Sequence, residues 1–354
     1  MPLDPAYDDM VTQPITLALQ GGGSLGAFGW GVLDRLLDTP DLRFEVVSGA
    51  SAGAMNAAML VQGLAIGGPA EAKRLLEIFW RRVAVISGSP DLPTAWLSPF
   101  GYMVSPMADA LRQTTRRLTQ REVNPLGLNP LRTVLDGLFD PAALRLEGAP
   151  RLVVSATRVS TGEARLFQGE EVTPEVLLAS ACLPQLFPAV EIDGEPYWDG
   201  GFASNPPLRP LIEAGAPPDI LLVRTTPVAR PGVPIGATAI LERTEEMTFG
   251  AALRQELRSL ALAQRVLEDH SEAWGVLARL RDARLHVIGA EQEFRALKTG
   301  SHQDASWAFL HSMRELGHEA ADRWLATDRA GVGVRSTLDL SQFRGPVLEP
   351  GFAV

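Results

Sequence analysis

Short apolar runs alternate along this chain with longer segments in which apolar residues recur every three or four positions. The run 15–19 ends in a glycine cluster, and the segment 27–37 that follows has its apolar residues at helical spacing. The same alternation continues almost to the C-terminus. It predicts strands at 15–19, 44–47, 151–156, 165–168, 189–192, 219–224 and 285–288. It predicts helices at 27–37, 52–64, 71–83, 106–118, 130–139, 173–182, 207–214, 238–274 and 306–325.

Strands that alternate with helices are typical of a mainly parallel sheet covered by helices on both faces. We therefore expect a three-layer α/β/α fold. Residues 13–213 contain all the chemical motifs described below, and we expect them to form one domain. Residues 214–354 are rich in helical patterns, and we expect them to complete that domain or to pack on it.

The regular pattern breaks down between residues 87 and 130. In this stretch Pro, Gly and Ser are interleaved with aromatic and apolar residues, and only 106–118 has helical spacing. An irregular connection of this length within a compact domain is usually a lid, a binding loop or a mobile segment. We expect residues 87–130 to form a lid or cap inserted into the first domain.

The composition is that of a folded protein with an acidic balance. The chain is 46% hydrophobic and 21% charged, and 32 basic and 42 acidic residues give a formal net charge of −10. This balance argues against a nucleic-acid partner, because phosphates bind to basic faces. Cys182 is the only cysteine, which excludes an intrachain disulfide and a thiolate zinc cluster.

No segment has the pattern of a signal peptide or of a membrane-spanning helix. The N-terminal residues 1–14 are acidic and interrupted by proline, without a basic and an apolar region. The stretch 46–70 has no charge, but Ser, Asn, Gln and Gly are scattered through it, which favours a buried strand–turn–helix. We expect a soluble, cytoplasmic protein.

A G-x-S-x-G motif stands between the apolar run 44–47 and the helix expected at 52–64. In this motif, Gly49, Ser51 and Gly53 are spaced by two alanines. A serine on a sharp strand-to-helix turn is exposed for nucleophilic attack, and its position at the helix N-terminus favours developing negative charge. The alternative is a turn of small residues that only packs the helix on the sheet. The context favours Ser51 as a nucleophile.

A second glycine motif, Gly21–Gly26, also follows an apolar run and precedes a helix. It matches the G-x-G-x-x-G pattern of dinucleotide-binding sites. Such a site would need an acidic residue at the end of the next strand, whereas Glu45 lies near the start of that strand. No Gly-Lys-Ser/Thr follows, which excludes a phosphate-loop NTP site here. Consecutive glycines could instead present backbone N–H groups beside the nucleophile as an oxyanion hole. A tight turn without a ligand is the remaining interpretation.

A nucleophilic serine needs a base, and the sequence offers two kinds of candidate. Asp199 ends an apolar segment and is followed by Gly200 and Gly201, where the backbone can turn and direct the carboxylate into a site, although Asp-Gly is also a common turn. The histidines all lie downstream, on predicted helices among charges, in a strand or in a polar loop. They are His270, His286, His302, His311 and His318.

Together the three glycine motifs resemble the patatin-like phospholipase family. Gly21–Gly26, Gly49–Gly53 and Asp199–Gly201 occur in that family's order, and the stretches 179–184 and 187–188 resemble its usual approach to the aspartate. The resemblance covers about residues 15–210. The stretch 124–130 is similar to bacterial members that carry an extra segment.

The resemblance implies a serine acyl hydrolase that cleaves lipid esters, with residues 13–213 as its catalytic domain. It implies a Ser51–Asp199 dyad without histidine, an acyl-Ser51 intermediate, and an oxyanion hole formed by the backbone N–H groups of Gly22, Gly23 and Ser24. The sequence departs from the family at two positions, Leu25, where many members have Arg or Lys, and Gln20, where plant members have Asp. No metal and no cofactor are implied.

Two interaction surfaces can be expected within the segment 87–130. Aromatic and apolar residues there could cover an acyl chain, and basic residues could meet anionic lipid headgroups at a peripheral membrane contact. The apolar ones are Trp96, Leu97, Phe100, Tyr102 and Met103; the basic ones are Arg112, Arg116, Arg117 and Arg121. A core-packed loop and a solvated helix face are the alternatives. The C-terminal helices could also pair in a homo-oligomer.

Two other functions stay open at this point. One is an esterase of another kind, in which a downstream histidine is the base. The other is a non-catalytic protein that binds a nucleotide or a lipid through the Gly21–Gly26 loop. The sequence leaves the substrate open among phospholipids, glycerides, short esters, thioesters and polyesters.

Overall fold

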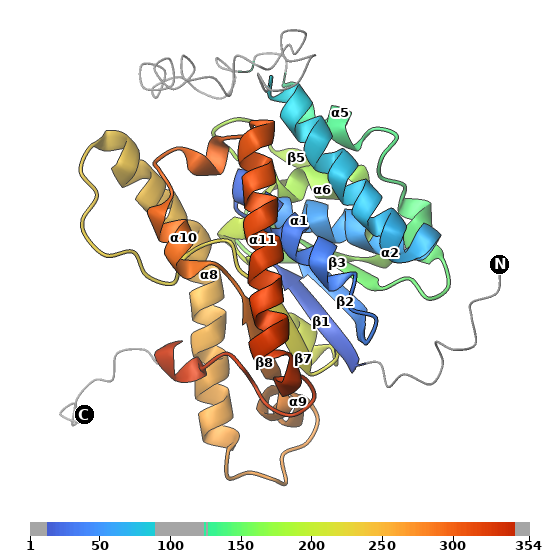
Figure 1. Cartoon of the computed structure of the whole chain (residues 1–354), viewed down its shortest axis with the longest axis vertical. Helices are drawn as coiled ribbons and strands as arrows, with labels where there is room; N and C mark the ends of the chain where they lie inside the picture. The colour runs from blue at the N-terminus through green and yellow to red at the C-terminus, as the bar shows by residue number, and fades with distance from the viewer. Residues whose placement is uncertain (1–12, 89–123, 125–126, 344–354) are drawn as a thin grey trace.

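The computed structural model describes residues 13–88, 124 and 127–343 of the chain. They form one eight-stranded sheet covered by helices (Figure 1). The strands are β1 Gln13–Leu19, β2 Leu42–Gly49, β3 Arg151–Arg158, β4 Ala164–Gln168, β5 Val190–Ile192, β6 Glu195–Asp199, β7 Asp219–Val223 and β8 Arg284–Ile288. The helices are α1 Gly26–Leu36, α2 Ala52–Ile86, α5 Pro130–Leu135, α6 Pro174–Ser180, α7 Arg209–Glu213, α8 Ala237–Leu267, α9 Val276–Asp282, α10 Glu291–Ala296 and α11 Trp307–Thr327.

The sheet is parallel in its middle and antiparallel at one edge. The strand order is β5-β6-β3-β2-β1-β7-β8, with β4 paired to β3. The pairs from β3 through β2, β1 and β7 to β8 are all parallel, whereas β4, β5 and β6 join antiparallel. The three-layer α/β/α fold with a mainly parallel sheet, which the sequence predicts, is confirmed.

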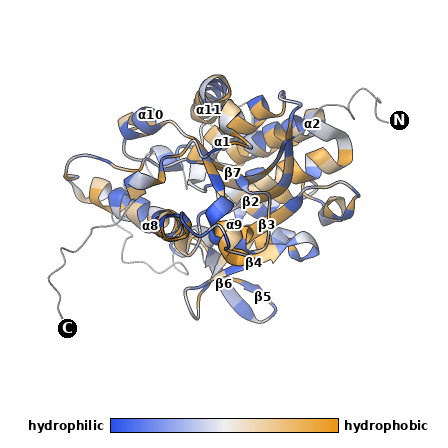
Figure 2. Ribbon diagram, turned by 90° about the horizontal axis from the view of Figure 1, so that it is seen from below, coloured by the Kyte–Doolittle hydropathy of each residue, from blue (hydrophilic) through white to orange (hydrophobic). Residues whose placement is uncertain are grey.

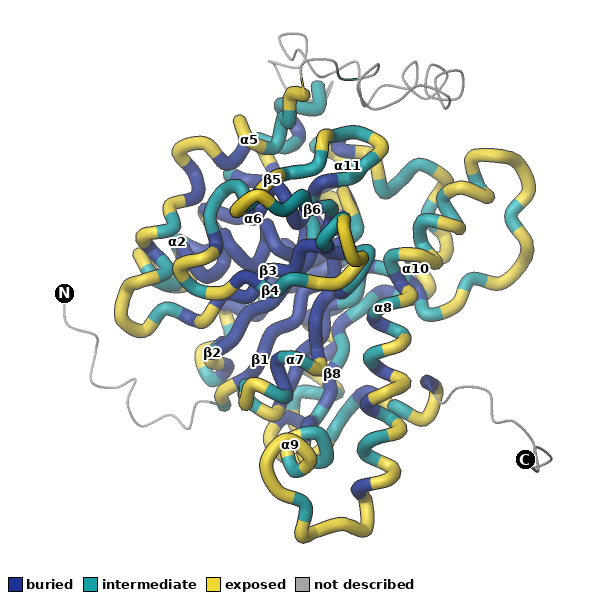
Figure 3. Tube along the Cα trace, turned by 180° about the vertical axis from the view of Figure 1, so that it is seen from behind, coloured by how far each residue is buried: buried dark blue, intermediate teal, exposed yellow. Residues whose placement is uncertain are grey.

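Successive residues of the central strands face two different helical layers. Leu17 and Leu19 of β1 belong to the core cluster that includes α1, α2 and α11, whereas Ala18 belongs to the cluster that includes α8. This is the two-residue side-chain period of a strand, and a strand buried on both faces shows it as a continuous apolar run. Figure 2 shows the apolar sheet between the two helical layers, and Figure 3 shows its central strands buried.

Helices α1 and α11 pack closely because each has a glycine at the contact. A Cβ atom on Gly31 would overlap the backbone of Arg314, and one on Gly317 would overlap the carbonyl of Phe28. The C-terminal helix α11 therefore lies against the helix that follows the first glycine motif. The structure thus joins residues far apart in the sequence around one core.

The helix at 238–274 was predicted to be too long. Helix α8 ends at Leu267, and the separate helix α9 begins at Val276 after Gly275, which has a φ of +62°. Asp269, His270, Ser271 and Gly275 in this interval are weak helix formers, a local signal that the prediction did not use. Arg281 also donates to the carbonyls of His270 and Ser271, and this contact stabilises the turn.

The other boundaries also differ where tertiary contacts decide them. The helices predicted at 52–64 and 71–83 are both present in α2, which is broken between them at Gly68, where φ is 70° and ψ is −159°, just before Pro69. The helix predicted at 207–214 is only α7, because the carboxylate of Glu256 on α8 accepts hydrogen bonds from the amides of Leu208 and Arg209. The helix predicted at 130–139 ends at Leu135.

None of the helices in the described ranges combines the length and apolar content that crossing a lipid bilayer requires.

Candidate active site

The carboxyl ends of β2 and β6 meet on one side of β3. The last residue of β2, Gly49, lies opposite Val154, and the last residue of β6, Asp199, lies opposite Ala156. Strand β4 pairs with β3 along both of these regions and therefore occupies its other side. Because β2 and β6 share one side of β3, the turn that follows Gly49 must approach Asp199.

Ser51 lies on a strained turn between β2 and α2. Its φ of 54° and ψ of −128° are rare for a residue with a side chain, and such strain is typical of a nucleophile elbow. The turn is tight because its flanks are glycines. A Cβ atom on Gly49 would overlap the backbone of Gly53, and one on Gly53 would overlap the carbonyl of Leu19. The spacing of the motif is thus required for packing as well as for exposing the serine.

The Ser51 hydroxyl donates to the Asp199 carboxylate. The distance from Ser51 Oγ to Asp199 Oδ2 is 2.7 Å. The other carboxylate oxygen, Oδ1, accepts from the amide of Gly201 at 2.8 Å, which fixes the carboxylate plane. The backbone of Asp199 is held as well, because its amide donates to the Cys182 carbonyl and its carbonyl accepts from the Thr157 hydroxyl, both at 2.8 Å.

Burial gives Asp199 the proton affinity of a base that works near neutral pH. The residue is 1% exposed, and this desolvation raises the pKa of its carboxyl to about 7, against the hydrogen bonds from Ser51 and Gly201, which lower it. A carboxylate of this kind accepts a proton more readily than an exposed aspartate. The neighbouring Cys182 is not activated in this way. Burial, followed by the charge of Asp199, raises the pKa of its thiol to about 12, which keeps the thiol protonated.

Two side chains hold the first glycine of the Gly21–Gly26 loop against the elbow. The Gly21 amide donates to Asn205 Oδ1 at 2.7 Å, and the Gly21 carbonyl accepts from Thr225 Oγ1 at 2.8 Å. A Cβ atom on Gly21 would lie 2.6 Å from the Ala50 carbonyl and 2.7 Å from Ser51 Cβ. The loop therefore contacts Ala50 and Ser51 of the elbow directly.

The next three backbone amides of this loop are available to a ligand. The N–H groups of Gly22, Gly23 and Ser24 donate to no acceptor within the described residues. Gly23 is exposed, Gly22 is half-buried and Ser24 is buried, so the first two residues are open to solvent and the third is not. They are the residues that the sequence indicates as oxyanion donors. Leu25, at the position where many relatives are basic, is half-buried against the apolar core.

Sequence reasoning missed the residues that hold the site in place. Ser180, at the end of α6, accepts the Ser51 amide through its Oγ at 3.0 Å, so that amide is not free to bind substrate. Thr157, Asn205 and Thr225 hold Asp199 and Gly21 as described above. Ser180 lies within the 179–184 motif and could have been found there. Thr157 and Thr225 become visible only once the strand order is known.

All five histidines lie in the described part of the chain, and none forms a hydrogen bond with Ser51 or Asp199. His286 is buried in β8, where its Nε2 lies 3.0 Å from Asp219 Oδ1. His302 lies between two carboxylates of α8, and the remaining three are at the surface of the molecule. The described residues also contain no group of three or more metal-ligating side chains.

The expected lid lies almost entirely outside the described residues. Of 87–130, the structure describes 87–88, 124 and 127–130. The helix predicted at 106–118 and the side chains expected to contact lipid, from Trp96 to Arg121, are among the rest.

Comparisons with known proteins give weak structural likenesses and one family match. VipD from Legionella pneumophila is 15% identical over 90% of this chain and 67% of its own, with a TM-score of 0.41. Two structures of the ExoU–SpcU complex from Pseudomonas aeruginosa are 15% and 18% identical, with TM-scores of 0.29, and the chain spans about half of their length (52% and 53%). A search of curated proteins gave no match.

The family match covers more than half of the chain and includes the site itself. A model of the patatin-like phospholipase family matches residues 17–212, which include Ser51, Asp199 and both glycine motifs. The matched part is more than half of the 354 residues. The chain therefore belongs to the patatin-like phospholipase family, a family of lipid-ester hydrolases.

Proposed function

We propose that this protein is a serine acyl hydrolase in which Ser51 is the nucleophile and Asp199 is the general base. The observation that carries the proposal is the 2.7 Å hydrogen bond from Ser51 Oγ to the buried Asp199 carboxylate. The absence of any bond from Ser51 to a histidine in the described chain disfavours an esterase with a histidine base.

In the proposed reaction, Asp199 accepts the proton of Ser51 Oγ while this oxygen attacks the ester carbonyl carbon. The negative charge that develops on the carbonyl oxygen is stabilised by the amides of Gly22, Gly23 and Ser24, and each such donor typically contributes about 2.7–4 kcal/mol. The protonated Asp199 then donates to the leaving alcohol oxygen, which leaves acyl-Ser51. A water that gives its proton to Asp199 hydrolyses this ester and releases the fatty acid and Ser51.

Exposed apolar side chains on α8 and in the loop before it support a lipid substrate. Val233 and Ile235, in the loop before α8, are 87% and 93% exposed, and Ile240, Leu241 and Met247 of α8 are also exposed. This part of α8 lies close to the catalytic loops, because its Glu242 accepts from the amide of Gly300, just before the 3₁₀ turn Ser301–Gln303, which packs against the Gly23–Leu25 turn. We propose that residues 233–247 contact the lipid surface at a peripheral membrane site.

The membrane contact is tested with the double variant Val233→Asp and Ile235→Asp. We expect its activity on vesicles to fall about tenfold or more while its activity on a short soluble ester stays unchanged, because two charges disfavour insertion into lipid. Equal activity of variant and wild type on vesicles would contradict this contact. A parallel fall on both substrates would point to a defect of the catalytic site.

The dyad is tested by fluorophosphonate labelling with intact-mass readout, alongside hydrolysis of a p-nitrophenyl ester. We expect one adduct on the wild type and none on Ser51→Ala, because the reagent bonds only to an activated nucleophile. An adduct that persists in Ser51→Ala would overturn the assignment of the nucleophile. Saturable NAD binding without labelling or turnover would instead favour the binding protein that the Gly21–Gly26 loop also allows.

A further inference from the structure

A small pocket opens where the order of the sheet strands reverses. From β1 the chain continues to β2 on one side, whereas β7 and β8 lie on the other side. In open α/β sheets, ligands bind outside the carboxyl ends of the strands at such a switch point. The pocket lies there, between the ends of β1 and β7 and helix α8, and its lining includes Gln20, Thr226, Leu253, Arg254 and Phe343.

Gln20 brings an unused hydrogen-bond donor to this pocket. The side chain is only 2% exposed, and its Oε1 accepts from the amides of Thr225 at 2.9 Å and Thr226 at 3.2 Å and from the Thr226 hydroxyl at 3.2 Å. These bonds orient the amide group. Its Nε2, however, is buried and has no acceptor in the described chain. A buried donor left without an acceptor is unfavourable, so a ligand that accepts from it is stabilised.

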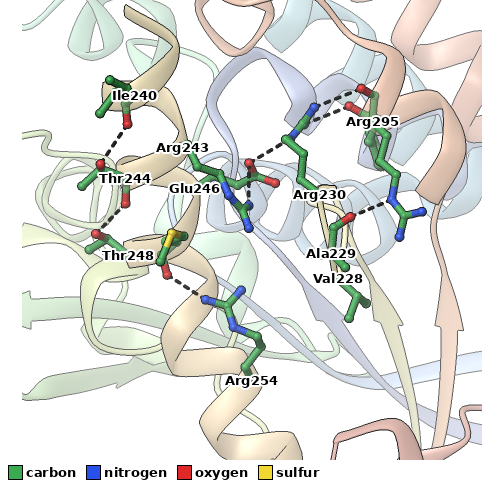
Figure 4. A network of polar contacts seen from close by, with 12 residues as sticks. Val228, Ala229, Arg230, Ile240, Arg243, Thr244, Glu246, Thr248, Arg254 and Arg295 are labelled. Carbon is green, nitrogen blue, oxygen red and sulfur yellow. Dashed lines mark hydrogen bonds and ion pairs between the residues drawn. The ribbon is translucent and has the colours of Figure 1, made fainter. Parts of the chain in front are cut away.

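Arg254 brings a positive charge that no carboxylate in the described part of the chain pairs with. Figure 4 shows Arg230 and Arg243 converging on Glu246, while Arg254 points to a backbone carbonyl. That acceptor is the carbonyl of Met247, at 2.9 Å from Arg254 Nη2. Burial, followed by the nearby Arg243 and Arg258, lowers the pKa of Arg254. An anion in the pocket would offset both the desolvation of the Arg254 charge and its repulsion by the two neighbouring arginines.

The other charged side chain of the pocket is already neutralised. Arg224 donates from Nη2 to Glu291 Oε2 at 2.8 Å. The pocket therefore has one free positive charge and one free amide donor, beside the apolar walls of Leu253, Leu257 and Phe343. This combination matches a monovalent anion with two acceptor oxygens and an apolar tail.

We propose that the pocket between β1, β7 and α8 binds a carboxylate, with one oxygen on Gln20 Nε2 and the other on Arg254. The first carbons of the bound molecule pack on the apolar wall. Two sources share this chemistry, a small free carboxylate and the fatty acid that the proposed reaction releases. Only the second source depends on the proposed hydrolysis, so the binding can be tested separately from catalysis.

The experiment is an NMR titration of the full chain with sodium acetate at constant ionic strength. The reporters are the side-chain amide of Gln20 and the Nε–H of Arg254. We expect saturable shifts of both signals with a Kd on the order of 10 mM, the weak affinity of a ligand with only a few contacts. No saturable shift of either signal would overturn the proposal.

Matched variants separate this site from general ion effects. Arg254→Gln should abolish the shift of Gln20, whereas Arg258→Gln, which removes an exposed arginine one turn further along α8, should leave it unchanged. Gln20→Glu keeps the acceptor for Thr225 and Thr226 but replaces the donor with a negative charge, so the Arg254 signal should no longer respond. An equal acetate shift in Arg254→Gln and wild type would overturn the proposal.

A second titration, with octanoate on the Ser51→Ala protein, identifies the source. Binding at least about tenfold tighter than acetate, measured on the same two signals, would support the fatty acid, because the longer chain buries more apolar surface on the wall of the pocket. Equal affinities would support a small free carboxylate at the same pocket. Failure of fluorophosphonate labelling with acetate binding intact would overturn the hydrolase and leave this site standing.

Discussion

Two buried aspartates of the same sheet have opposite surroundings. Asp199, at the end of β6, is 1% exposed, and within the described residues its carboxylate accepts only from the Ser51 hydroxyl and the Gly201 amide. Asp219, at the start of β7, is 3% exposed. Its carboxylate accepts from Arg284 Nε at 2.9 Å and Nη2 at 2.6 Å, from the Gly333 amide at 2.9 Å, and faces His286 Nε2 at 3.0 Å.

The two environments shift the pKa values in opposite directions. Burial raises the pKa of Asp199 to about 7. Burial also acts to raise the pKa of Asp219, but the hydrogen bonds from His286 and Arg284 outweigh it and hold the pKa well below the usual value of an aspartate. Both carboxylates are buried, so the hydrogen bonds from His286 and Arg284, and not the depth of burial, account for the difference between the two pKa values. An aspartate paired with arginine stabilises the fold, whereas one that faces only neutral donors can act as a base.

The largest contrast is expected in catalysis. Asp199→Asn should lower kcat for ester hydrolysis about 10³-fold, because an amide cannot accept the Ser51 proton. Asp219→Asn should leave kcat of the folded enzyme within about threefold of wild type, since a change this far from the reacting atoms should alter the barrier by well under 1 kcal/mol. Both are measured with a p-nitrophenyl ester at 20 °C, after circular dichroism confirms folding. A comparable loss of kcat in both variants would contradict the assignment of a catalytic role to Asp199 and a structural role to Asp219.

In stability the order should be reversed, with Asp219→Asn more destabilised than Asp199→Asn. Asp219→Asn leaves the partly exposed Arg284 without the buried carboxylate that it pairs with, and breaking a fully buried ion pair typically costs about 3–5 kcal/mol. We expect a loss of at most this size in the free energy of unfolding at pH 7, measured by urea denaturation. The reference is Asp199→Asn, which removes no cation pair. An Asp219→Asn variant as stable as the wild type would show that the Arg284 contact is not structural.

The pH dependence of stability should also separate the two residues. Asp199 has a raised pKa when folded, so the folded protein binds the extra proton and stability falls as the pH rises from about 4 to about 7. Asp199→Asn should therefore be more stable than wild type above pH 7, by at most about 4 kcal/mol, and should not differ near pH 4. The Asp219 pair has the opposite sign, because its stabilisation is lost as the pH falls below about 4.

Urea denaturation of the wild type and Asp199→Asn at pH 4, 6 and 8 tests the prediction for Asp199. If Asp199→Asn gave the same difference from wild type at all three pH values, the raised pKa would be wrong.

How much of this could be read from the sequence depends on whether a contact is local. Ser51, Asp199 and the glycine loop could be predicted, because each belongs to a short motif whose chemistry requires those residue types. Asp219 could not, since nothing in a buried apolar strand indicates that its first residue pairs with Arg284, 65 positions later. That pairing exists only because β8 lies beside β7 in the sheet.

The fold shows the same limit. The alternation of strands and helices predicted the three layers, whereas the start of α7 is decided by Glu256, which acts from another element. The antiparallel placement of β6, which brings Asp199 to Ser51, also follows from strand order and not from any local pattern.

The smallest expected effect is the pH profile of catalysis, and it tests directly whether Asp199 is the base. Only the ionised carboxylate can accept the Ser51 proton, so kcat/KM should rise with pH and level off above the Asp199 pKa of about 7. At pH 5 it should be about 100-fold below the plateau, since about 1% of the carboxylate is ionised two pH units below its pKa. Asp219→Asn should show the same midpoint, because Asp219 is ionised throughout this range. A midpoint near 4 in the wild type would mean that Asp199 is solvated like a surface aspartate, whereas a shifted midpoint in Asp219→Asn would mean that the two aspartates are coupled across the sheet.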